Sequence, residues 1–161
     1  MMKPDIHKEH EWLTRLVGEW SYEHDCSMGP DKPRETFAGT ETVRAIGDAW
    51  IIAESTGEMP GGGTAQAVLT LGYEPENKRY VGTWFGSMMT RLWVYEAKIE
   101  EPFRRLALHS DGPSFSGDGS IASYKDVIEI LSDDHRTFTS HMLDADGNWQ
   151  EFMTAHYRRW K

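Results

Sequence analysis

From residue 19 to residue 160 the chain is a succession of short segments in which apolar and polar residues alternate, each followed by a turn. Alternation with a period of two is typical of β-strands that bury one face. Ten strands are predicted, at residues 19–28, 36–46, 49–59, 64–74, 79–86, 89–96, 104–110, 120–132, 135–144 and 148–160. The breaks between them are rich in glycine, proline, aspartate and asparagine, the residues that turns require.

Strands joined by short turns pair with their neighbours in sequence, and a sheet of this many strands removes its open edges by closing. The predicted fold class is therefore all-β: an antiparallel up-and-down barrel of about ten strands. Residues 5–17 differ, because Trp12, Leu13 and Leu16 recur at helical spacing. We expect one N-terminal helix there, plugging one end of the barrel. No linker or shift in composition divides the chain, so residues 1–161 are predicted to form one domain.

Charge and cysteine content exclude several classes of partner. The chain has 17 Lys and Arg against 26 Asp and Glu, a net charge of −9, and a nucleic-acid partner would need a basic face. The single cysteine, Cys26, excludes an internal disulfide and a thiolate metal cluster. The first twenty residues are charged throughout, and no segment approaches the ~18 apolar residues of a membrane span. We expect a cytoplasmic protein without a bound metal or a membrane partner.

The short turns also predict which residues face one another, because turn length sets the register of a hairpin. A two-residue turn between the second and third strands pairs Glu41 with Glu54. The next turns bring Leu69 and Trp84 into the same row, with Arg91 opposite Trp84. One face then carries most of the rings, and we take it as the interior: Trp50, Tyr73, Tyr80, Trp84, Trp93 and Tyr95.

The last three strands predict a second polar row. A two-residue turn at residues 133–134 pairs Asp126 with His141, and a three-residue turn at residues 145–147 pairs His141 with Glu151. A carboxylate on one ring nitrogen would orient the histidine and free the other nitrogen for a ligand, a metal or a proton. The alternative is a row of cross-strand charge pairs, each worth a few tenths to about 1 kcal/mol. In this register Arg136 faces outward.

Together these rows predict a ring-walled cavity for a small amphipathic molecule, the usual pattern of an apolar pocket with a few placed polar groups. The predicted ligand-binding residues are Glu41, Glu54, Tyr73, Tyr80, Trp84, Arg91, Trp93, Tyr95, Asp126, His141 and Glu151. Four carboxylates would face one arginine and one histidine, and buried charges need partners. Protonation of some carboxylates, a bound cation or polar ligand, or a register shifted by one residue would each resolve this.

Two other functions remain open at this point. Glu41 and Glu54 could form an acid–base couple with His141 as a polarising group, which would make the protein an enzyme. The structural alternative is an ion-paired cluster at the barrel mouth. Apolar residues predicted on the outer face would instead form an interface between two copies, a homodimer: Val81, Phe85, Leu92 and Val94.

Several stretches resemble a bacterial domain-of-unknown-function family of small calycin-like (lipocalin-like) barrel proteins. They are Glu9-His10-Glu11-Trp12-Leu13, Leu16-Val17-Gly18-Glu19-Trp20, Leu71-Gly72-Tyr73, Tyr80-Val81-Gly82-Thr83-Trp84, Leu92-Trp93-Val94-Tyr95-Glu96, Tyr124-Lys125-Asp126-Val127-Ile128, Glu151-Phe152-Met153 and Tyr157-Arg158-Arg159. The resemblance implies an antiparallel barrel of about ten strands and no activity. Trp20 with Arg158 and Arg159 resembles the closing end of a lipocalin-type barrel, where a tryptophan packs under an arginine of the last strand.

A more distant similarity is to nitrobindin-type barrels, which hold heme through a histidine near the C-terminus. It makes His141 or His156 a candidate heme ligand. The glycine-rich N-terminal pattern of those proteins is absent, and only Gly18-x-Trp20 remains. We expect no cofactor, with heme as the alternative.

Overall fold

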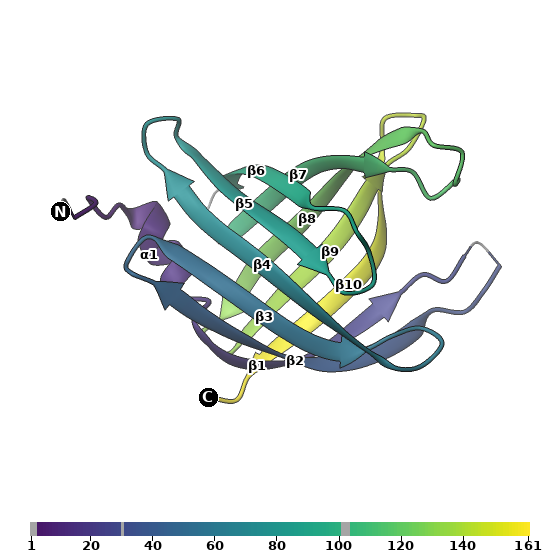
Figure 1. The fold of residues 1–161 in the computed structure, drawn as a ribbon, viewed down its shortest axis with the longest axis horizontal. Helices are drawn as coiled ribbons and strands as arrows, with labels where there is room; N and C mark the ends of the chain where they lie inside the picture. Colours follow the sequence, from purple (N-terminus) through teal and green to yellow (C-terminus); the bar gives the residue numbers. More distant parts are fainter. Residues whose placement is uncertain (1–2, 30, 101–103) are drawn as a thin grey trace.

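The protein is a closed antiparallel barrel of ten strands with one short helix, which confirms the predicted fold class (Figure 1). The structure, a computed structural model, describes residues 3–29, 31–100 and 104–161, with side chains left out at 98–100. The elements are α1 (Lys8–Thr14), β1 (Gly18–Cys26), β2 (Glu35–Ile46), β3 (Trp50–Glu58), β4 (Thr64–Glu74), β5 (Arg79–Gly86), β6 (Trp93–Glu100), β7 (Arg105–Pro113), β8 (Ile121–Ser132), β9 (His135–Leu143) and β10 (Trp149–Arg159). Each strand pairs with its sequence neighbours and β1 pairs with β10, so the sheet closes without a free edge.

The helix is shorter than the predicted range 5–17 and lies across one end of the barrel (Figure 1). The Trp12 and Leu13 side chains of this helix are buried. Two strand residues hold it in place: the Tyr80 hydroxyl donates to the Glu9 carbonyl over 2.9 Å, and His10 Nε2 lies 3.0 Å from a carbonyl oxygen of β4. This end of the barrel is therefore closed by packing and by hydrogen bonds.

The seam between β1 and β10 is closed by Trp20 and Arg159. The Trp20 indole is buried, and its Nε1 donates to the Leu16 carbonyl over 2.9 Å. The Arg159 guanidinium lies 4.3 Å from the Trp20 ring and donates to the carbonyls of Arg15 and Val17. The predicted packing of Trp20 under an arginine of the last strand is confirmed, with Arg159 as the partner.

The predicted register is wrong in β3. Three residues, not two, form the turn at 47–49, so Ile46 pairs with Trp50 and Glu41 pairs with Ser55. A shift of one residue reverses the two faces of a strand. Glu54 therefore faces outward, and Trp50 is 46% exposed. The turn between β3 and β4, at residues 59–63, is also one residue longer than expected. The two errors cancel, so the β4 residues predicted to face the interior do so.

The predicted register is also wrong in β9. An irregularity between Ile130 and Ser132 shifts the pairing by one residue, so Asp126 pairs with Ser140 instead of His141. Arg136 consequently faces the interior. The predicted pairing of His141 with Glu151 is correct, but both face outward. A second irregularity between Glu151 and Met153 separates this outward pair from the interior residues of β10.

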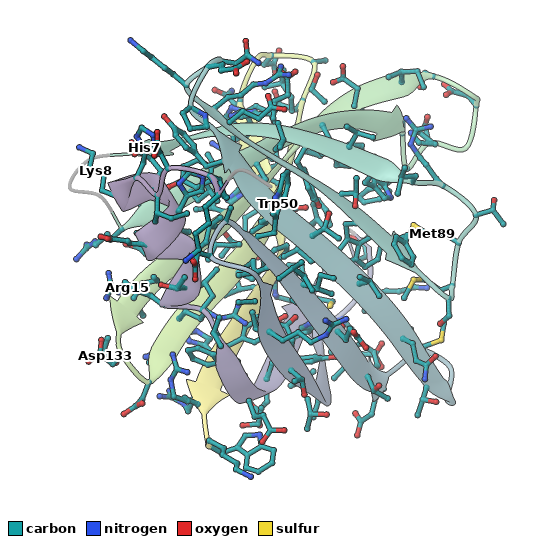
Figure 2. All side chains as sticks on the ribbon, turned by 60° about the vertical axis from the view of Figure 1, so that its left-hand side comes forward. His7, Lys8, Arg15, Trp50, Met89 and Asp133 are labelled. Atoms are coloured by element: carbon teal, nitrogen blue, oxygen red, sulfur yellow. The ribbon has the colours of Figure 1, made fainter. Side chains whose placement is uncertain are left out.

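The two ends of the barrel carry different side chains (Figure 2). Arg15 and Asp133 form an exposed ion pair, 3.8 Å apart, beside α1, and Met89 lies at the opposite end.

On the outer face, Phe85, Leu92 and Val94 are 45%, 53% and 61% exposed, and their pairing with a second copy stays a prediction. In the described part of the chain, α1 is too short to cross a lipid bilayer.

Candidate functional site

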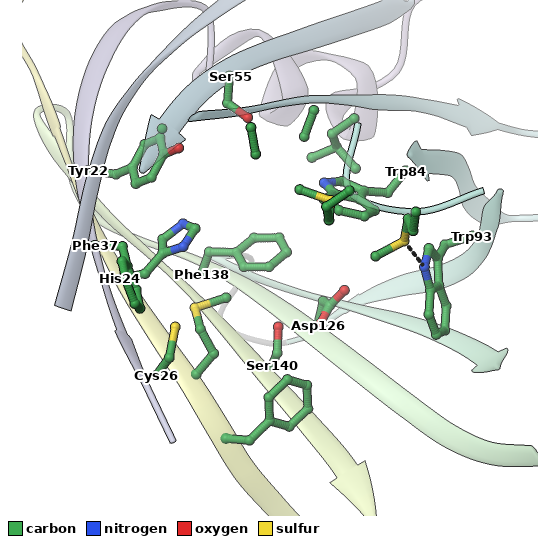
Figure 3. A pocket seen from close by; sticks show the side chains of 18 of the residues that line it. Tyr22, His24, Cys26, Phe37, Ser55, Trp84, Trp93, Asp126, Phe138 and Ser140 are labelled. Carbon is green, nitrogen blue, oxygen red and sulfur yellow. Dashed lines mark hydrogen bonds between the residues drawn. The ribbon is translucent and has the colours of Figure 1, made fainter. Parts of the chain in front are cut away.

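A cavity of about 530 Å³ occupies the barrel interior at the end opposite α1. It falls within the size range of small-molecule sites in proteins, about 300–1,000 Å³. Its walls are mostly rings and thioethers, among them Trp84, Trp93, Tyr95, Tyr124, Phe138, Tyr157, Met59, Met88, Met89 and Met153. Figure 3 shows several of these side chains turned toward the common space.

An ion pair between Glu41 and Arg136 lies in the deep part of the cavity. Both residues are buried, and their charged groups are in hydrogen-bond contact. The Arg136 guanidinium also lies 4.0 Å from the Tyr157 ring and 4.6 Å from the Trp20 ring. Rings on which a cation packs compensate part of its lost hydration. Glu41 is thus neutralised by a partner that the predicted register had placed outside.

Asp126 is the second acidic group of the cavity, and it lies on β8. The Tyr95 hydroxyl donates to Asp126 Oδ2 over 2.5 Å, and Ser140 is its cross-strand partner. Burial raises the pKa of the Asp126 carboxyl, while hydrogen bonds from Ser140 and Tyr95 oppose that rise. Burial and the neighbouring Asp126 carboxylate raise the pKa of Tyr95 well above its ordinary value, so Tyr95 is the donor of this pair.

Tyr22 and His24 form part of the wall on β1, with their rings stacked at a centroid distance of 4.5 Å. Burial lowers the pKa of His24 to about 4, so its imidazole is neutral at physiological pH. The Tyr22 side chain has space only because glycines occupy the adjacent positions on β2 and β3. A Cβ added at Gly39 or Gly57 would come within 2.3 or 2.2 Å of the Tyr22 ring or hydroxyl.

The mouth of the cavity is formed by aromatic and methionine side chains from the β5–β6 and β7–β8 connections. Trp93 Nε1 donates to Met89 Sδ over 3.1 Å, the one hydrogen bond drawn in Figure 3, and the Trp93 ring meets Tyr124 edge-on at 5.2 Å. Arg91 is exposed, lies 5.3 Å from the Trp93 ring, and donates to the Asp111 carbonyl. Methionine side chains adapt to irregular shapes, so this rim is suited to admitting a ligand.

Of the residues predicted from sequence to bind a ligand, six line the cavity: Glu41, Trp84, Arg91, Trp93, Tyr95 and Asp126. Tyr73 and Tyr80 lie instead at the closed end, where their rings pack together at 4.9 Å beneath α1. The ring-bearing residues at both ends follow the same alternation in the sequence. The position of the helix decides which of these rings are covered and which line the cavity.

The other three predicted residues lie on the outer surface. Glu54 pairs with Arg44 at 3.4 Å, and Glu151 pairs with Arg34 at 3.1 Å. His141 has its Nδ1 3.3 Å from the Lys125 carbonyl. The predicted row Asp126–His141–Glu151 and the predicted couple Glu41–Glu54 are therefore not assembled, because each depended on a register that is off by one residue.

The predicted heme ligands are also on the outside. His141 does not line the cavity, and His156 faces outward, its Nδ1 2.9 Å from His135 Nε2. Within residues 3–29, 31–100 and 104–161, no three His, Cys, Asp or Glu side chains are grouped so as to hold a metal ion.

Sequence reasoning missed Arg136, Ser140 and His24 as cavity residues. One signal for the first two was present: Ile130 and Leu131 are consecutive apolar residues just before a turn, which breaks the alternation of β8. Such a break is typical of a β-bulge, and a bulge there reverses the faces of β9.

Solved structures of other proteins share this fold at low sequence identity. Rv2717c from M. tuberculosis aligns with a TM-score of 0.68 at 12% identity, covering 98% of this chain and 100% of that one. The S-type phycobiliprotein lyase CPES from Guillardia theta aligns with a TM-score of 0.60 at 16% identity, covering 98% and 99%. At these identities the likeness shows the fold alone. No curated protein matches the chain in sequence. Residues 5–159 match the family described as "Protein of unknown function (DUF1579)", so the chain belongs to this family of barrels, as the resemblance predicted.

Proposed function

We propose that the protein binds a small amphipathic molecule inside the barrel. The observation that carries this proposal is the cavity of about 530 Å³, which is walled by rings and thioethers and contains a few buried polar groups. Rings such as Trp84 and Trp93 would cover the apolar part of the ligand. Polar groups on the wall, chiefly Asp126 and Ser140, would orient its polar part.

The closed end supports a binding role over a purely structural one. The barrel fills its interior with side chains near α1, where Leu71, Leu106 and Ile128 are fully buried. The same strands leave space at the other end, although larger residues at Ala65 or Ala67 would fill it. Filling a core stabilises a protein, so an apolar space kept open calls for a ligand to explain it.

The test is a fluorescence titration with N-phenyl-1-naphthylamine, a neutral dye that brightens in apolar surroundings. We expect saturable binding of one dye per barrel. Ala67→Trp would fill the cavity and abolish binding, whereas Val68→Trp, on the outer face of the same strand, would leave it intact. Native mass spectrometry of protein purified from cells would add the mass of a retained molecule. Dye binding that survives Ala67→Trp and disappears in Val68→Trp would place the site outside the barrel and overturn the proposal.

A further inference from the structure

The Asp126 carboxylate differs from Glu41 because, in the described part of the chain, it forms no ion pair with an arginine or lysine; His141 is the cationic group whose charge acts on it. Glu41 has Arg136, and Glu58 lies at the exposed rim. Within the described residues, no ion pair joins Asp126 to an Arg or Lys side chain. Its partners are neutral hydroxyls: Tyr95 donates over 2.5 Å, and Ser140 lies directly across the strand pair.

Tyr95 and Ser140 both donate to the Asp126 carboxyl, and hydrogen bonds donated to a carboxylate favour its ionised form. Asp126 lines the cavity and is only half-buried, so its free surface faces the enclosed space instead of the surrounding protein. A negative charge is therefore presented to whatever enters.

Aromatic rings surround this carboxylate. Tyr95 bonds to it, and Tyr124 lies two residues earlier on the same face of β8. Trp93, two residues before Tyr95, meets Tyr124 edge-on at 5.2 Å. Phe138 lies two residues from Ser140 on β9, a diagonal neighbour across the strand pair. Figure 3 shows Asp126 and Ser140 together, with Phe138 and Trp93 turned toward the same space.

Rings around a carboxylate form the environment that binds organic ammonium groups, because the faces of the rings and the negative charge both attract a cation. Two arginines line the cavity, and each has other partners. Arg136 is held by Glu41 and packed on Tyr157, and Arg91 lies exposed at the mouth, near the Trp93 ring, where it donates to the Asp111 carbonyl. The chain as a whole carries −9, which raises the local concentration of cations and repels anions.

We infer that the ligand is a cationic amphiphile, an organic amine or ammonium, whose charged group is held by Asp126 within the ring set Trp93, Tyr95, Tyr124 and Phe138. This inference rests on the proposed function and specifies the ligand class for the same site. The apolar part of such a molecule would occupy the remaining ring- and methionine-lined space.

The test displaces N-phenyl-1-naphthylamine with three molecules that share a ten-carbon chain: decyltrimethylammonium, decan-1-ol and decyl sulfate, each below its micelle concentration. We expect decyltrimethylammonium to displace the dye at a concentration about tenfold lower than decan-1-ol, since one well-placed charge contact is worth roughly that factor. Decyl sulfate should be the weakest. Asp126→Asn should remove the preference for the cation, so that decyltrimethylammonium and decan-1-ol displace the dye from this variant at similar concentrations.

Glu54→Gln is the matched control, because it makes the same change in net charge on the outer surface. It should keep the preference for the cation. Equal displacement by the three molecules, or a preference that persists in Asp126→Asn, would overturn this inference and leave the proposed function standing. Absence of dye binding to the unmodified protein would overturn both.

Discussion

The two ends of the barrel use the same kinds of side chain for different purposes. At the α1 end, Trp12, Trp20 and Tyr80 are at most 2% exposed, and the last two donate to backbone carbonyls of the N-terminal segment. At the other end, Trp93 and Phe115 are partly or largely exposed, and the rings lie around a space. Aromatic residues thus complete a core at the end that α1 covers, and they line a cavity at the end where the described part of the chain places no such cover.

The largest expected effect is a difference in how much stability the protein loses when a tryptophan is removed from one end or from the other. Trp12→Ala should lower the free energy of unfolding by about 3–5 kcal/mol, since it leaves a hole in a packed core. Trp93→Ala should cost roughly 1 kcal/mol, a typical value for a single substitution, because part of its ring already faces the cavity. Urea unfolding of both variants provides the measurement. Equal losses would mean that the open end is as well packed as the closed one.

A second comparison concerns the Glu41–Arg136 pair, which lies between the two ends. Arg136→Met should cost about 3–5 kcal/mol, because it leaves the Glu41 charge buried without a partner. The double variant Arg136→Met with Glu41→Gln should recover much of the loss, as measured by a double-mutant cycle in urea. Additive losses would show that the two groups do not interact.

A pH dependence at the cavity end is expected to be smaller than the losses in Trp12→Ala and Arg136→Met. The His24 pKa is about 4 in the folded protein and near 6.5 when unfolded, so the unfolded chain binds more protons below pH 6.5. Stability should therefore fall as the pH drops from 6.5 toward 4, by roughly 2–3 kcal/mol at most.

His24→Gln isolates this effect when thermal unfolding is followed against pH. The raised pKa of Asp126 acts with the opposite sign, because it lowers stability as the pH rises above the unfolded value. That contribution is common to both proteins and cancels in the difference between them. Parallel pH profiles for the two proteins would show that His24 is not buried as described.

The candidate site was predictable only in part, and the errors have one origin. Leu69 opposite Trp84 and Tyr73 opposite Tyr80 follow from the turn at 75–78 and are correct. Trp84 meets Trp93 instead of Arg91, a two-residue difference that keeps the same face inward. A turn one residue longer than expected moved Glu54 outside, and a bulge before residue 132 brought Arg136 inside. Local residue preferences do not determine such single insertions, because tertiary packing decides between them.

The sequence by itself determined the strands, their order and the closure of the barrel, because alternation and turn residues are local and ten strands in series have few ways to pair. It also determined that the N-terminal helix is amphipathic. Only the tertiary structure decided which charged groups share the cavity. In a strand of period two, one residue of slippage exchanges the inside for the outside, so Asp126 and Arg136 acquire their roles from the register of the closed barrel.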